Sequence, residues 1–526
     1  MTVRLPDHLD LIATAPAGIQ KLRGLILELA VRGRLVPQDP NDEPASELLK
    51  RIAKERARQE TAGLSKPSKA TPLSEDTERS FKVPETWQWV RFEEIAQHNS
   101  GKTLDKGRNS GEPRPYITTS NLYWGRFELD SVRQMLINDD ELQRCTARMN
   151  DLLICEGGEA GRAAVWPNDY EICFQNHVHR ARLFGGINPY FAYRFFEKLN
   201  ASGEIDLYRK GVGISNMSGK ALASILFPVP PLAEQHRIVA KVNELMALCD
   251  RLEAEQTDAG AAHARLVATL LGTLTQSADA AELAANWQRL AEHFDTLFTT
   301  EASLDALKQT ILQLAVMGKL VPQDPHERPV LGKLGDFAEF LNGYAFKSQW
   351  FTDAGVRLLR NTNVAHGECD WKDSAYISAD RLDEFKTFAL VPGDLVLSLD
   401  RPIISTGLKL ARISRQDLPC LLLQRVAKVS PRPDEVAPDY LFHWFNGPVF
   451  TKAIDPGRSK GVPHISTKHA ADVPFVRYSI DEQHRIVAKV DELLALVDRL
   501  KAGLAESRAR QEHLAATLIE SALQAA

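Results

Sequence analysis

The amino-acid sequence contains two copies of one long helical segment. Residues 234–252 read EQHRIVAKVNELMALCDRL and residues 482–500 read EQHRIVAKVDELLALVDRL, so 16 of 19 positions are identical at an offset of 248. A second repeat, ILELAVRGRLVPQDP at 26–40 and ILQLAVMGKLVPQDP at 311–325, has an offset of 285. The difference of 37 residues predicts an insertion in the first copy, which we place within 42–84. A chain built this way is expected to form two equivalent structural units.

Both copies open a long amphipathic helix. Apolar residues recur at alternating steps of four and three, which is the a/d seam of a coiled coil, with charged residues around it. Pro230-Pro231 prevents an earlier helix before the first copy, and Ser479 and Asp481 can cap the second. We predict helices of about 40 residues, roughly 60 Å long, that pack as an intramolecular antiparallel pair rather than as unrelated surface helices. The predicted seam comprises Ile238, Val242, Leu245, Cys249 and Leu252, and Ile486, Val490, Leu493, Val497 and Leu500.

The segments between the repeats share little sequence and have a mixed α/β pattern. Short apolar runs such as 151–155 and 393–397 lie between turn residues, as strands do, and helices are expected after Pro189 and Pro438. The segments align weakly but in order, through Gly101/Gly343, Asn121/Asn363, Gln175/Gln424 and Pro189/Pro438. We therefore predict an α+β chain in which two mixed α/β domains are separated by the two antiparallel helices, with a pseudo-twofold internal repeat. The predicted bounds are 1–84 for an N-terminal helical region, 85–230 and 331–479 for the two domains, 231–330 for a central helical region, and 480–526 for the second long helix.

Composition excludes several classes of protein. Charged residues make up 25% and hydrophobic residues 44% of 526 residues, which is typical of a soluble globular chain. No apolar stretch approaches the ~18 residues of a membrane span, and the start lacks a signal-peptide core. The six cysteines are scattered without a C-x-x-C pair, so we predict reduced thiols in a cytoplasmic protein, with no disulfide frame and no zinc site.

The catalytic motifs are incomplete. Residues 96–103 satisfy a permissive phosphate-loop pattern, but 104–111 is too rich in turn residues to open the helix that such a loop needs. Asn188-Pro189-Tyr190-Phe191 lacks the second proline of an amino-methyltransferase loop, and His177-Val178-His179 has no further metal ligand nearby. We therefore predict no catalytic, cofactor-binding or metal-binding residues. Two alternatives stay open, a self-contained DNA methyltransferase or nuclease, and a coiled-coil protein adaptor that does not bind DNA.

Polar clusters at turns suggest a reader of base edges. The two domains are nearly neutral, with 17 Lys+Arg against 18 Asp+Glu in 85–230 and 19 against 17 in 331–480. A sequence-specific reader needs only a few well-placed Arg, Asn, Gln, Ser and Thr side chains, although solvated loop residues look the same one by one. The candidate DNA-binding residues are Lys102, Thr119, Asn121, Gln175, Asn176, Arg209 and Lys210 in the first domain, and Lys347, Ser348, Arg360, Asn361, Asn363, Gln424, Arg425, Arg458 and Lys460 in the second.

These motifs resemble the specificity subunit of type I restriction-modification systems over nearly the whole chain. The resemblance rests on E-Q-H-R-I-V-A-K-V-[ND]-E-L at 234–245 and 482–493, on L-A-V-[RM]-G-[RK]-L-V-P-Q-D-P at 29–40 and 314–325, and on G-Y-A-F-K-S at 343–348. It implies two target-recognition domains that each read half of a split DNA site, with the helices setting the unread spacer. The first domain departs from the family at 100–103, where Ser-Gly-Lys-Thr stands in place of the opening motif.

The resemblance also implies the partners. They are double-stranded DNA, two methylation subunits that use S-adenosylmethionine to methylate adenine N6, and two restriction subunits that use ATP and magnesium; no membrane is implied. The outer faces of 234–275 and 482–520 are expected to contact the methylation subunits. The charged segment 47–60 is expected to form a helical arm against a partner.

Overall fold

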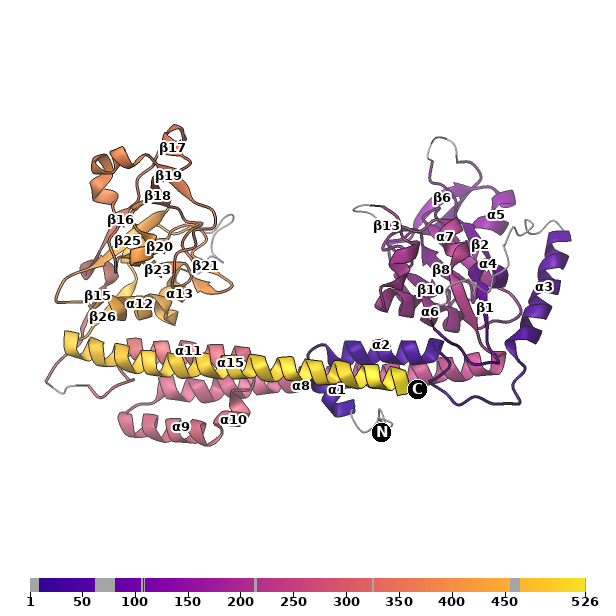
Figure 1. Cartoon of the computed structure of the whole chain (residues 1–526), viewed down its shortest axis with the longest axis horizontal. Coiled ribbons are helices and arrows are strands. Elements are labelled where there is room, and N and C mark those ends of the chain that lie inside the picture. Colours follow the sequence, from indigo (N-terminus) through magenta and orange to yellow (C-terminus); the bar gives the residue numbers. More distant parts are fainter. Residues whose placement is uncertain are drawn as a thin grey trace. The chain divides into compact units, whose positions relative to one another are not determined.

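The computed structural model describes residues 9–61, 81–105, 107, 109–211, 215–323, 326–454 and 464–525. The chain divides into two compact units (Figure 1). Unit 1 comprises Met1–Thr257 and Arg508–Ala526, and unit 2 comprises Asp258–Ser507. The sequence repeat is therefore a structural repeat, because each unit holds one short-helix repeat and the start of one long helix.

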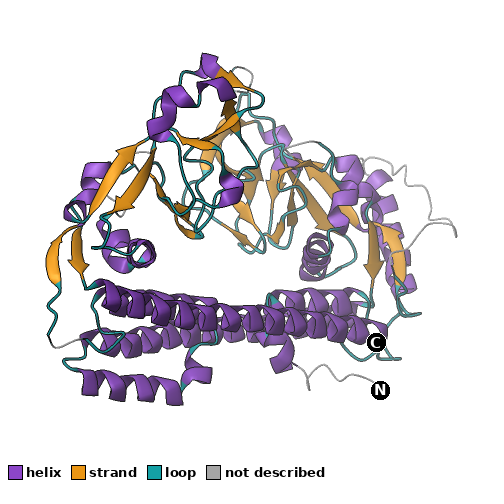
Figure 2. Ribbon diagram, turned by 60° about the vertical axis from the view of Figure 1, so that its left-hand side comes forward, coloured by secondary structure: helices purple, strands orange, loops and turns teal. Residues whose placement is uncertain are grey.

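The two long helices are α8 (Leu232–Gln276) and α15 (Ile480–Ala525), and each contributes residues to both units. In unit 1 the N-terminal half of α8 packs with the C-terminal end of α15, so that Ile238 and Ala515 share one core. In unit 2 the halves are exchanged, and Val267 of α8 shares a core with Val490 of α15. This exchange confirms the predicted antiparallel arrangement, and within each unit the helices lie side by side (Figures 1 and 2).

The seam residues face more than the partner helix. Those that are buried are Ile238, Val242, Cys249, Ile486, Val490 and Val497, while Leu245, Leu252, Leu493 and Leu500 are partly buried against the same cores. These cores also contain a third helix, α2 (Gly18–Val31) in unit 1 and α11 (Glu301–Val316) in unit 2, together with side chains of the adjoining domain. The seam therefore packs against a third helix in addition to the other long helix, because α2 and α11 carry apolar faces that also require burial.

Each of the two short helices is followed by a glycine at the equivalent position. Gly33 and Gly318 have φ of +69° and +66° and follow the C-caps of α2 and α11. This left-handed conformation after a helix is one that glycine adopts without steric cost. The repeated L-A-V-[RM]-G motif is therefore a helix followed by its terminator.

Domain 1 contains two four-stranded sheets above a two-stranded ribbon. The ribbon pairs β1 (Gln88–Arg91) with β14 (Leu226–Val229). The first sheet is antiparallel, in the order β10 (Ala163–Val165), β8 (Leu152–Cys155), β12 (Val178–Leu183) and β2 (Ala96–Ser100). The second has the order β6 (Arg133–Ile137), β3 (Glu112–Ile117), β11 (Ile172–Phe174) and β7 (Thr146–Ala147), with β3 and β11 parallel. Its helices are α4 (Phe92–Ile95), α5 (Asp139–Cys145), α6 (Pro189–Ala201) and α7 (Gly219–Ser224).

Domain 2 repeats this fold. Its ribbon pairs β15 (Val330–Lys333) with β26 (Pro474–Arg477), and its antiparallel sheet has the order β23 (Leu410–Arg412), β20 (Leu395–Ser398), β25 (Val426–Pro431) and β16 (Ala338–Asn342). The other sheet contains β17 (Phe351–Thr352), β19 (Ala375–Ile377), β18 (Val356–Leu359) and β24 (Cys420–Leu422), again with one parallel pair, and the helices are α12 (Pro438–Asn446), α13 (Pro448–Ala453) and α14 (Thr467–Ala471). The predicted pair of mixed α/β domains is confirmed.

The chain also contains further short helices and strands. They are the helices α1 (Leu9–Thr14), α9 (Ala280–Glu292) and α10 (Phe294–Leu297), and the two-residue strands β4 (Leu122–Tyr123), β5 (Arg126–Phe127), β9 (Gly157–Gly158), β13 (Ser215–Asn216), β21 (Ile403–Ile404) and β22 (Gly407–Leu408). None of the helices in the described ranges is long and apolar enough to cross a membrane. All six cysteines are free thiols, and only Cys369 is not fully buried.

The insertion of the first copy forms a helix that packs on domain 1. This helix is α3 (Ala45–Thr61), and its buried side chains include Leu48 and Ile52. A Cβ atom on Gly185 would lie 2.5 Å from Cγ1 of Ile52, so the glycine allows this close approach. Glu55 accepts a hydrogen bond from the Gly185 N–H at 3.1 Å. The apolar face of the predicted arm is therefore used within unit 1.

Candidate nucleic-acid interface

A buried glutamine joins each domain to its long helix. Gln235 Oε1 accepts from the N–H of Asn188, just before α6, at 2.8 Å, and Gln483 Oε1 accepts from the N–H of Ala437, just before α12, at 2.8 Å. Both glutamines are 0% exposed. Their Nε2 groups donate to backbone carbonyls, among them that of Pro230 in unit 1. The glutamine of E-Q-H-R-I thus fixes the N-terminus of the domain helix on the start of the long helix.

The preceding glutamate joins the two sequence repeats in unit 1. Glu234 accepts hydrogen bonds from the Trp87 indole at 2.8 Å and from Gln38 of the L-V-P-Q-D-P motif. Burial raises the pKa of Glu234, although both of these hydrogen bonds lower it. The loop that enters domain 1 is therefore held against α8 by contacts between motifs about 200 positions apart in the chain.

In domain 1 three loops leave the same end of the antiparallel sheet. They follow β2, connect β8 to β10, and connect β11 to β12, and the strand pairing brings their ends together. Asn176 donates its N–H to the carbonyl of Lys102 at 3.0 Å, and Glu156 donates to that of His177 at 2.8 Å. The small ribbon of β9 and β13 extends from the same place. We call this group of loops loop cluster 1.

Domain 2 has the equivalent loop cluster 2. Gln424 donates its N–H to the carbonyl of Tyr344 at 2.9 Å, and Leu399 donates to that of Arg425 at 2.8 Å. The guanidinium of Arg425 lies 3.0 Å from the Asp400 carboxylate. These residues come from the ends of β16, β20 and β25, which match β2, β8 and β12.

One glycine in each cluster permits this packing. A Cβ atom on Gly101 would lie 2.0 Å from the carbonyl oxygen of Phe174, and one on Gly343 would lie 2.1 Å from that of Leu423. The alignment of Gly101 with Gly343 is therefore explained by close approach of the backbone.

The predicted match of Gln175 with Gln424 is wrong by one residue. The main-chain donors Asn176 and Gln424 bond to Lys102 and Tyr344, which are the residues directly after these two glycines. Asn176 is therefore the equivalent of Gln424. Because Gln175 and Asn176 are both polar and lie in the same turn, the sequence alone does not show which of them aligns with Gln424.

Five of the candidate side chains are bound within the protein and are buried or half-buried. Asn121 and Asn363 are 3% and 1% exposed, and each accepts from the backbone N–H three residues earlier, at 3.0 and 3.2 Å. Arg209 donates to the carbonyl of Ala160 and to two further side chains. The remaining two are Lys102, which is paired with Glu141, and Arg360, which is paired with Asp373. Burial and bonding of this kind stabilise the loops, and we leave the two asparagines and Arg209 out of the proposed contact set.

The other candidates are more accessible. Lys210, Lys347, Ser348, Gln424 and Arg425 are exposed, and Thr119, Gln175, Asn176 and Asn361 are half-buried. Lys347 lies over the Trp350 ring at 5.3 Å. Arg458 and Lys460 lie outside the described residues.

The loop clusters contain polar residues that are absent from the list of candidate DNA-binding residues. Glu156 and His177 belong to cluster 1, and Asp400 and Arg401 belong to cluster 2. Carboxylates can accept a hydrogen bond from cytosine N4, so acidic side chains belong in a base-reading surface. The sequence offered one signal for the pair in cluster 2. Asp400-Arg401 directly follows the mainly apolar run 395–399, and a polar pair there marks the end of a strand.

Electrostatics at the sheet end favour neutral histidines and a fixed ion pair. Burial, together with His179, lowers the pKa of His98 to about 4. The hydrogen bond from Lys102 lowers the pKa of Glu141, so this carboxylate stays charged at neutral pH. Within the described ranges no group of three or more His, Cys, Asp or Glu residues could hold a metal ion. The clusters offer hydrogen-bond donors and acceptors, and we assign them no catalytic group.

The comparisons with known proteins agree with this arrangement. Residues 84–259 match the family model described as type I restriction modification DNA specificity domain. The chain is 42% identical to the type I restriction enzyme EcoAI specificity subunit of Escherichia coli, over 96% of this chain and 94% of that protein. It is 32% identical to the EcoEI specificity subunit of the same organism, over 96% of this chain and 94% of that protein. The chain therefore belongs to the family of type I restriction-modification specificity subunits, the non-catalytic components that recognise the DNA sequence.

A solved structure shares the fold. It comes from work on complex assembly and conformational transition of the type I R-M system, with a TM-score of 0.51 and 19% identity, and covers 84% of this chain and 99% of that chain. The resemblance to this family is confirmed by the two relatives, and the solved structure adds that the fold is shared.

Proposed function

We propose that each domain reads one half of a bipartite DNA site through its loop cluster, and that α8 and α15 set the length of the unread spacer. The observation that carries this proposal is the repeat itself. The antiparallel sheet has the same strand order in both domains, the same three strand ends carry each cluster, and the side chains in the two clusters differ. One fold with two sets of polar side chains is what two different half-sites require.

The proposed contact set contains the accessible candidates. In domain 1 these are Thr119, Gln175, Asn176 and Lys210, with Glu156 and His177 added from the structure. In domain 2 they are Lys347, Ser348, Asn361, Gln424 and Arg425, with Asp400 and Arg401 added, and Arg458 and Lys460 retained from the sequence. Lys102 and Arg360 act mainly by fixing the loops, since their charges are paired and their side chains are only 14% and 24% exposed, whereas Arg425 is paired with Asp400 but stays 59% exposed. Asn or Gln on adenine and Arg or Lys on guanine are the pairings that base-edge geometry favours.

The helices suit a spacer role. A helix rises about 1.5 Å per residue, so its length is fixed once its ends are held. Each domain is held on the start of its own long helix by the glutamine contacts of Gln235 and Gln483. A change in helix length would therefore move the half-sites along the DNA.

The partners complete the activity. We propose that two methylation subunits carrying S-adenosylmethionine bind the outer faces of the long helices and methylate adenine N6 in each half-site. Two restriction subunits would supply the ATP- and magnesium-dependent cleavage. Nothing in the described residues suggests that the chain performs these steps itself.

The decisive experiment is to sequence the methylome of a host with and without this chain, in the presence of its methylation subunit. We expect a bipartite motif with a methylated adenine in each half, and its disappearance when the chain is absent. Exchanging the domain-1 loops for those of a relative should change only one half of the motif.

Two outcomes would favour other functions. Methylation or cleavage of DNA by the purified chain alone would identify a self-contained enzyme. Absence of any sequence-dependent gel shift, even with the methylation subunit present, would identify a protein adaptor.

A further inference from the structure

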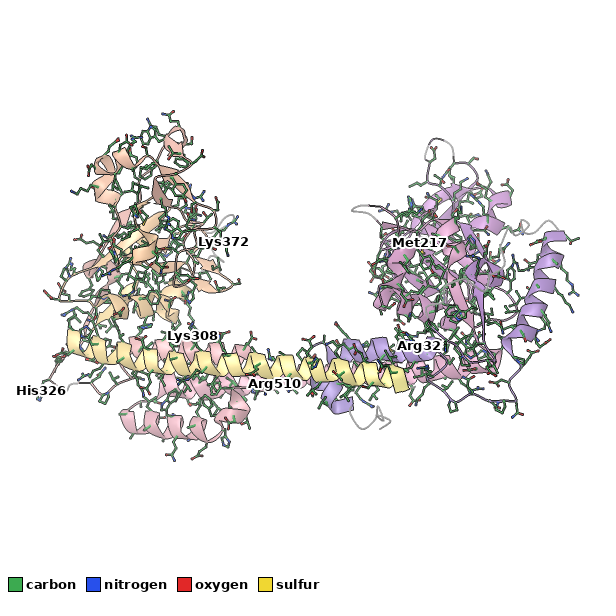
Figure 3. The ribbon with its side chains drawn as sticks, in the orientation of Figure 1. Arg32, Met217, Lys308, His326, Lys372 and Arg510 are labelled. Carbon is green, nitrogen blue, oxygen red and sulfur yellow. The ribbon has the colours of Figure 1, made fainter. Side chains whose placement is uncertain are left out.

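The outer face of the ribbon in unit 1 is covered by one phenylalanine. The ring of Phe81 lies on Trp89 of β1, with ring centroids 4.9 Å apart, and Trp89 is 9% exposed. The guanidinium of Arg32, labelled at the end of α2 in Figure 3, lies 4.9 Å from the centre of the same ring. Phe81 is brought there by the insertion that only the first copy carries. Unit 1 thus shows what this face of the fold binds, namely one aromatic ring.

The equivalent face in unit 2 is open. Strand register makes Leu331 the equivalent of Trp89, because Trp89 pairs with Pro228 of β14 and Leu331 pairs with Val476 of β26. Leu331 is 78% exposed, and its neighbour in the ribbon, Val330, is 41% exposed.

A second equivalent position is also apolar and exposed. Met317 is the C-cap of α11, as Arg32 is of α2, and it is 36% exposed. The end of α11 lies against the end of β26, because the Tyr478 hydroxyl donates to the carbonyl of Val316 at 3.0 Å. Met317 therefore borders the same ribbon as Leu331. We call Met317, Leu331 and Val476 the open ribbon face.

Among the residues that the structure describes, no segment equivalent to the one that carries Phe81 covers this face. Only His326–Pro329 separates the second L-V-P-Q-D-P repeat from β15, whereas residues 41–87 lie between the first repeat and β1. A single exposed leucine is ordinary on a protein surface. Leu331 and Met317 stand at the two positions whose equivalents, Trp89 and Arg32, contact an aromatic ring in unit 1. Val476 is paired with Leu331 in the ribbon, so the three apolar side chains form a prepared binding surface.

The residues that differ between the two ribbons indicate which kind of group the open ribbon face would bind. In unit 1 the ring is held by an indole, by Arg32 and by the Lys198 ammonium, which lies 5.3 Å from the ring centre. In unit 2 the ring would meet aliphatic side chains and the Met317 thioether. Methionine sulfur makes favourable contacts with aromatic rings, and burial of the exposed aliphatic side chains would add to them.

We propose that the open ribbon face binds an aromatic side chain on an extended segment of the methylation subunit, in the way that unit 1 binds its own Phe81. This inference rests on the proposed function, which supplies the partner protein. It predicts that the two units meet the methylation subunits differently, since only unit 2 has the open face.

The first test is site-specific photocrosslinking in the assembled complex. Leu331→p-benzoylphenylalanine is expected to crosslink to one peptide of the methylation subunit that contains Phe, Tyr or Trp. The control is Leu207→p-benzoylphenylalanine in unit 1, because Leu207 is 82% exposed and lies outside the ribbon. Crosslinks from position 331 to DNA, to a second copy of the chain or to nothing would overturn the inference.

The second test measures affinity for the purified methylation subunit. Leu331→Glu is expected to weaken binding at least tenfold, whereas Leu207→Glu leaves it unchanged within a factor of two. Both variants should fold, because both side chains are exposed. Equal affinity of the two variants would reject the open ribbon face, whereas failure of the unmodified chain to bind the methylation subunit would reject the proposed function itself.

Discussion

Gln235 and Gln483 are identical in the two repeats because both perform the same buried contact. Each side chain satisfies an N–H at the start of a domain helix and at least one backbone carbonyl. A buried polar group that loses its partner costs about 1–3 kcal/mol, so this contact strongly favours one position of the domain on the helix.

Replacing Gln483 should therefore destabilise unit 2. Gln483→Leu keeps the volume but leaves the Ala437 N–H and the Tyr478 carbonyl without their partner, and we expect a loss of about 3 kcal/mol in the free energy of unfolding. The matched control is Gln511→Leu, since Gln511 is an exposed residue of the same helix. Urea unfolding followed by circular dichroism measures both variants. Equal stabilities would show that the contact contributes little.

His98 should make the stability of unit 1 depend on pH. Its pKa falls from the ordinary 6.5 to about 4 in the folded chain, mainly through burial. As pH falls from 6.5 to 4, the unfolded chain takes up a proton that the folded chain resists, so stability is lost by up to about 3 kcal/mol. His98→Gln should remove that part of the loss, whereas His177→Gln, at an exposed position, should retain it. Unfolding curves at pH 7 and pH 4.5 compare the three proteins, and parallel losses in all of them would contradict the assignment.

The residue type alone did not distinguish polar side chains that stabilise a loop from polar side chains that are exposed at its surface. Asn121 and Gln424 occupy polar turns of similar composition, yet the first is 3% exposed and the second is exposed. The difference arises because Asn121 folds back on the N–H of Thr118, at 3.0 Å. Whether an amide turns inward depends on the path of the next loop, which local sequence does not specify.

At the scale of elements, periodicity and repeats were sufficient to find both long helices and the two central strands β8 and β20. The predicted helix starts at Pro189 and Pro438 are those of α6 and α12. We did not expect α2 and α11 to pack against the long helices, because their apolar faces do not correspond to any repeat within the long helices.

One difference between the two repeats follows from packing. Arg194 donates to Asn243 at 2.9 Å, whereas the equivalent His443 pairs with Asp491 at 2.8 Å.

Shortening both long helices should shorten the recognised spacer. Residues 257–262 of α8 are all exposed, as are most of the equivalent residues of α15, so a deletion there spares the domain contacts. Removing 257–263 and 505–511 together takes out seven residues from each helix, or about 10 Å of rise. With one turn of DNA spanning about 34–36 Å over 10–10.5 base pairs, we expect a spacer shorter by about three base pairs.

The control for this experiment is a chain shortened in one helix only, which should disrupt the pairing of the helices and abolish recognition. Methylome sequencing gives the spacer directly. An unchanged spacer in the doubly shortened chain would show that the helices do not measure the distance.

At the scale of the whole molecule, charge limits how the chain can hold DNA. The formal net charge is -5, and neither domain has a large excess of Lys and Arg. Several cations of the candidate surface are paired within the protein, as in Lys102 with Glu141. Nonspecific attraction to phosphates therefore contributes little, and specificity has to come from base contacts or from a basic partner.

This argument predicts a shallow salt dependence for DNA binding by the chain alone. The exposed cations of the described clusters are Lys210, Lys347, Arg401 and Arg425, and Arg458 and Lys460 bring the candidates to six. Each phosphate contact contributes about 0.9 to the slope of log Kd against log salt concentration, so the slope should not exceed about 5. This slope can be measured by fluorescence anisotropy at salt concentrations between 50 and 200 mM, roughly the range over which such slopes are resolved. A triple Lys210→Gln, Lys347→Gln and Arg425→Gln variant should lower the slope by up to about 3, and adding the methylation subunit should raise it. A slope of about 8 or more for the chain alone would mean that a basic surface outside these clusters holds the DNA.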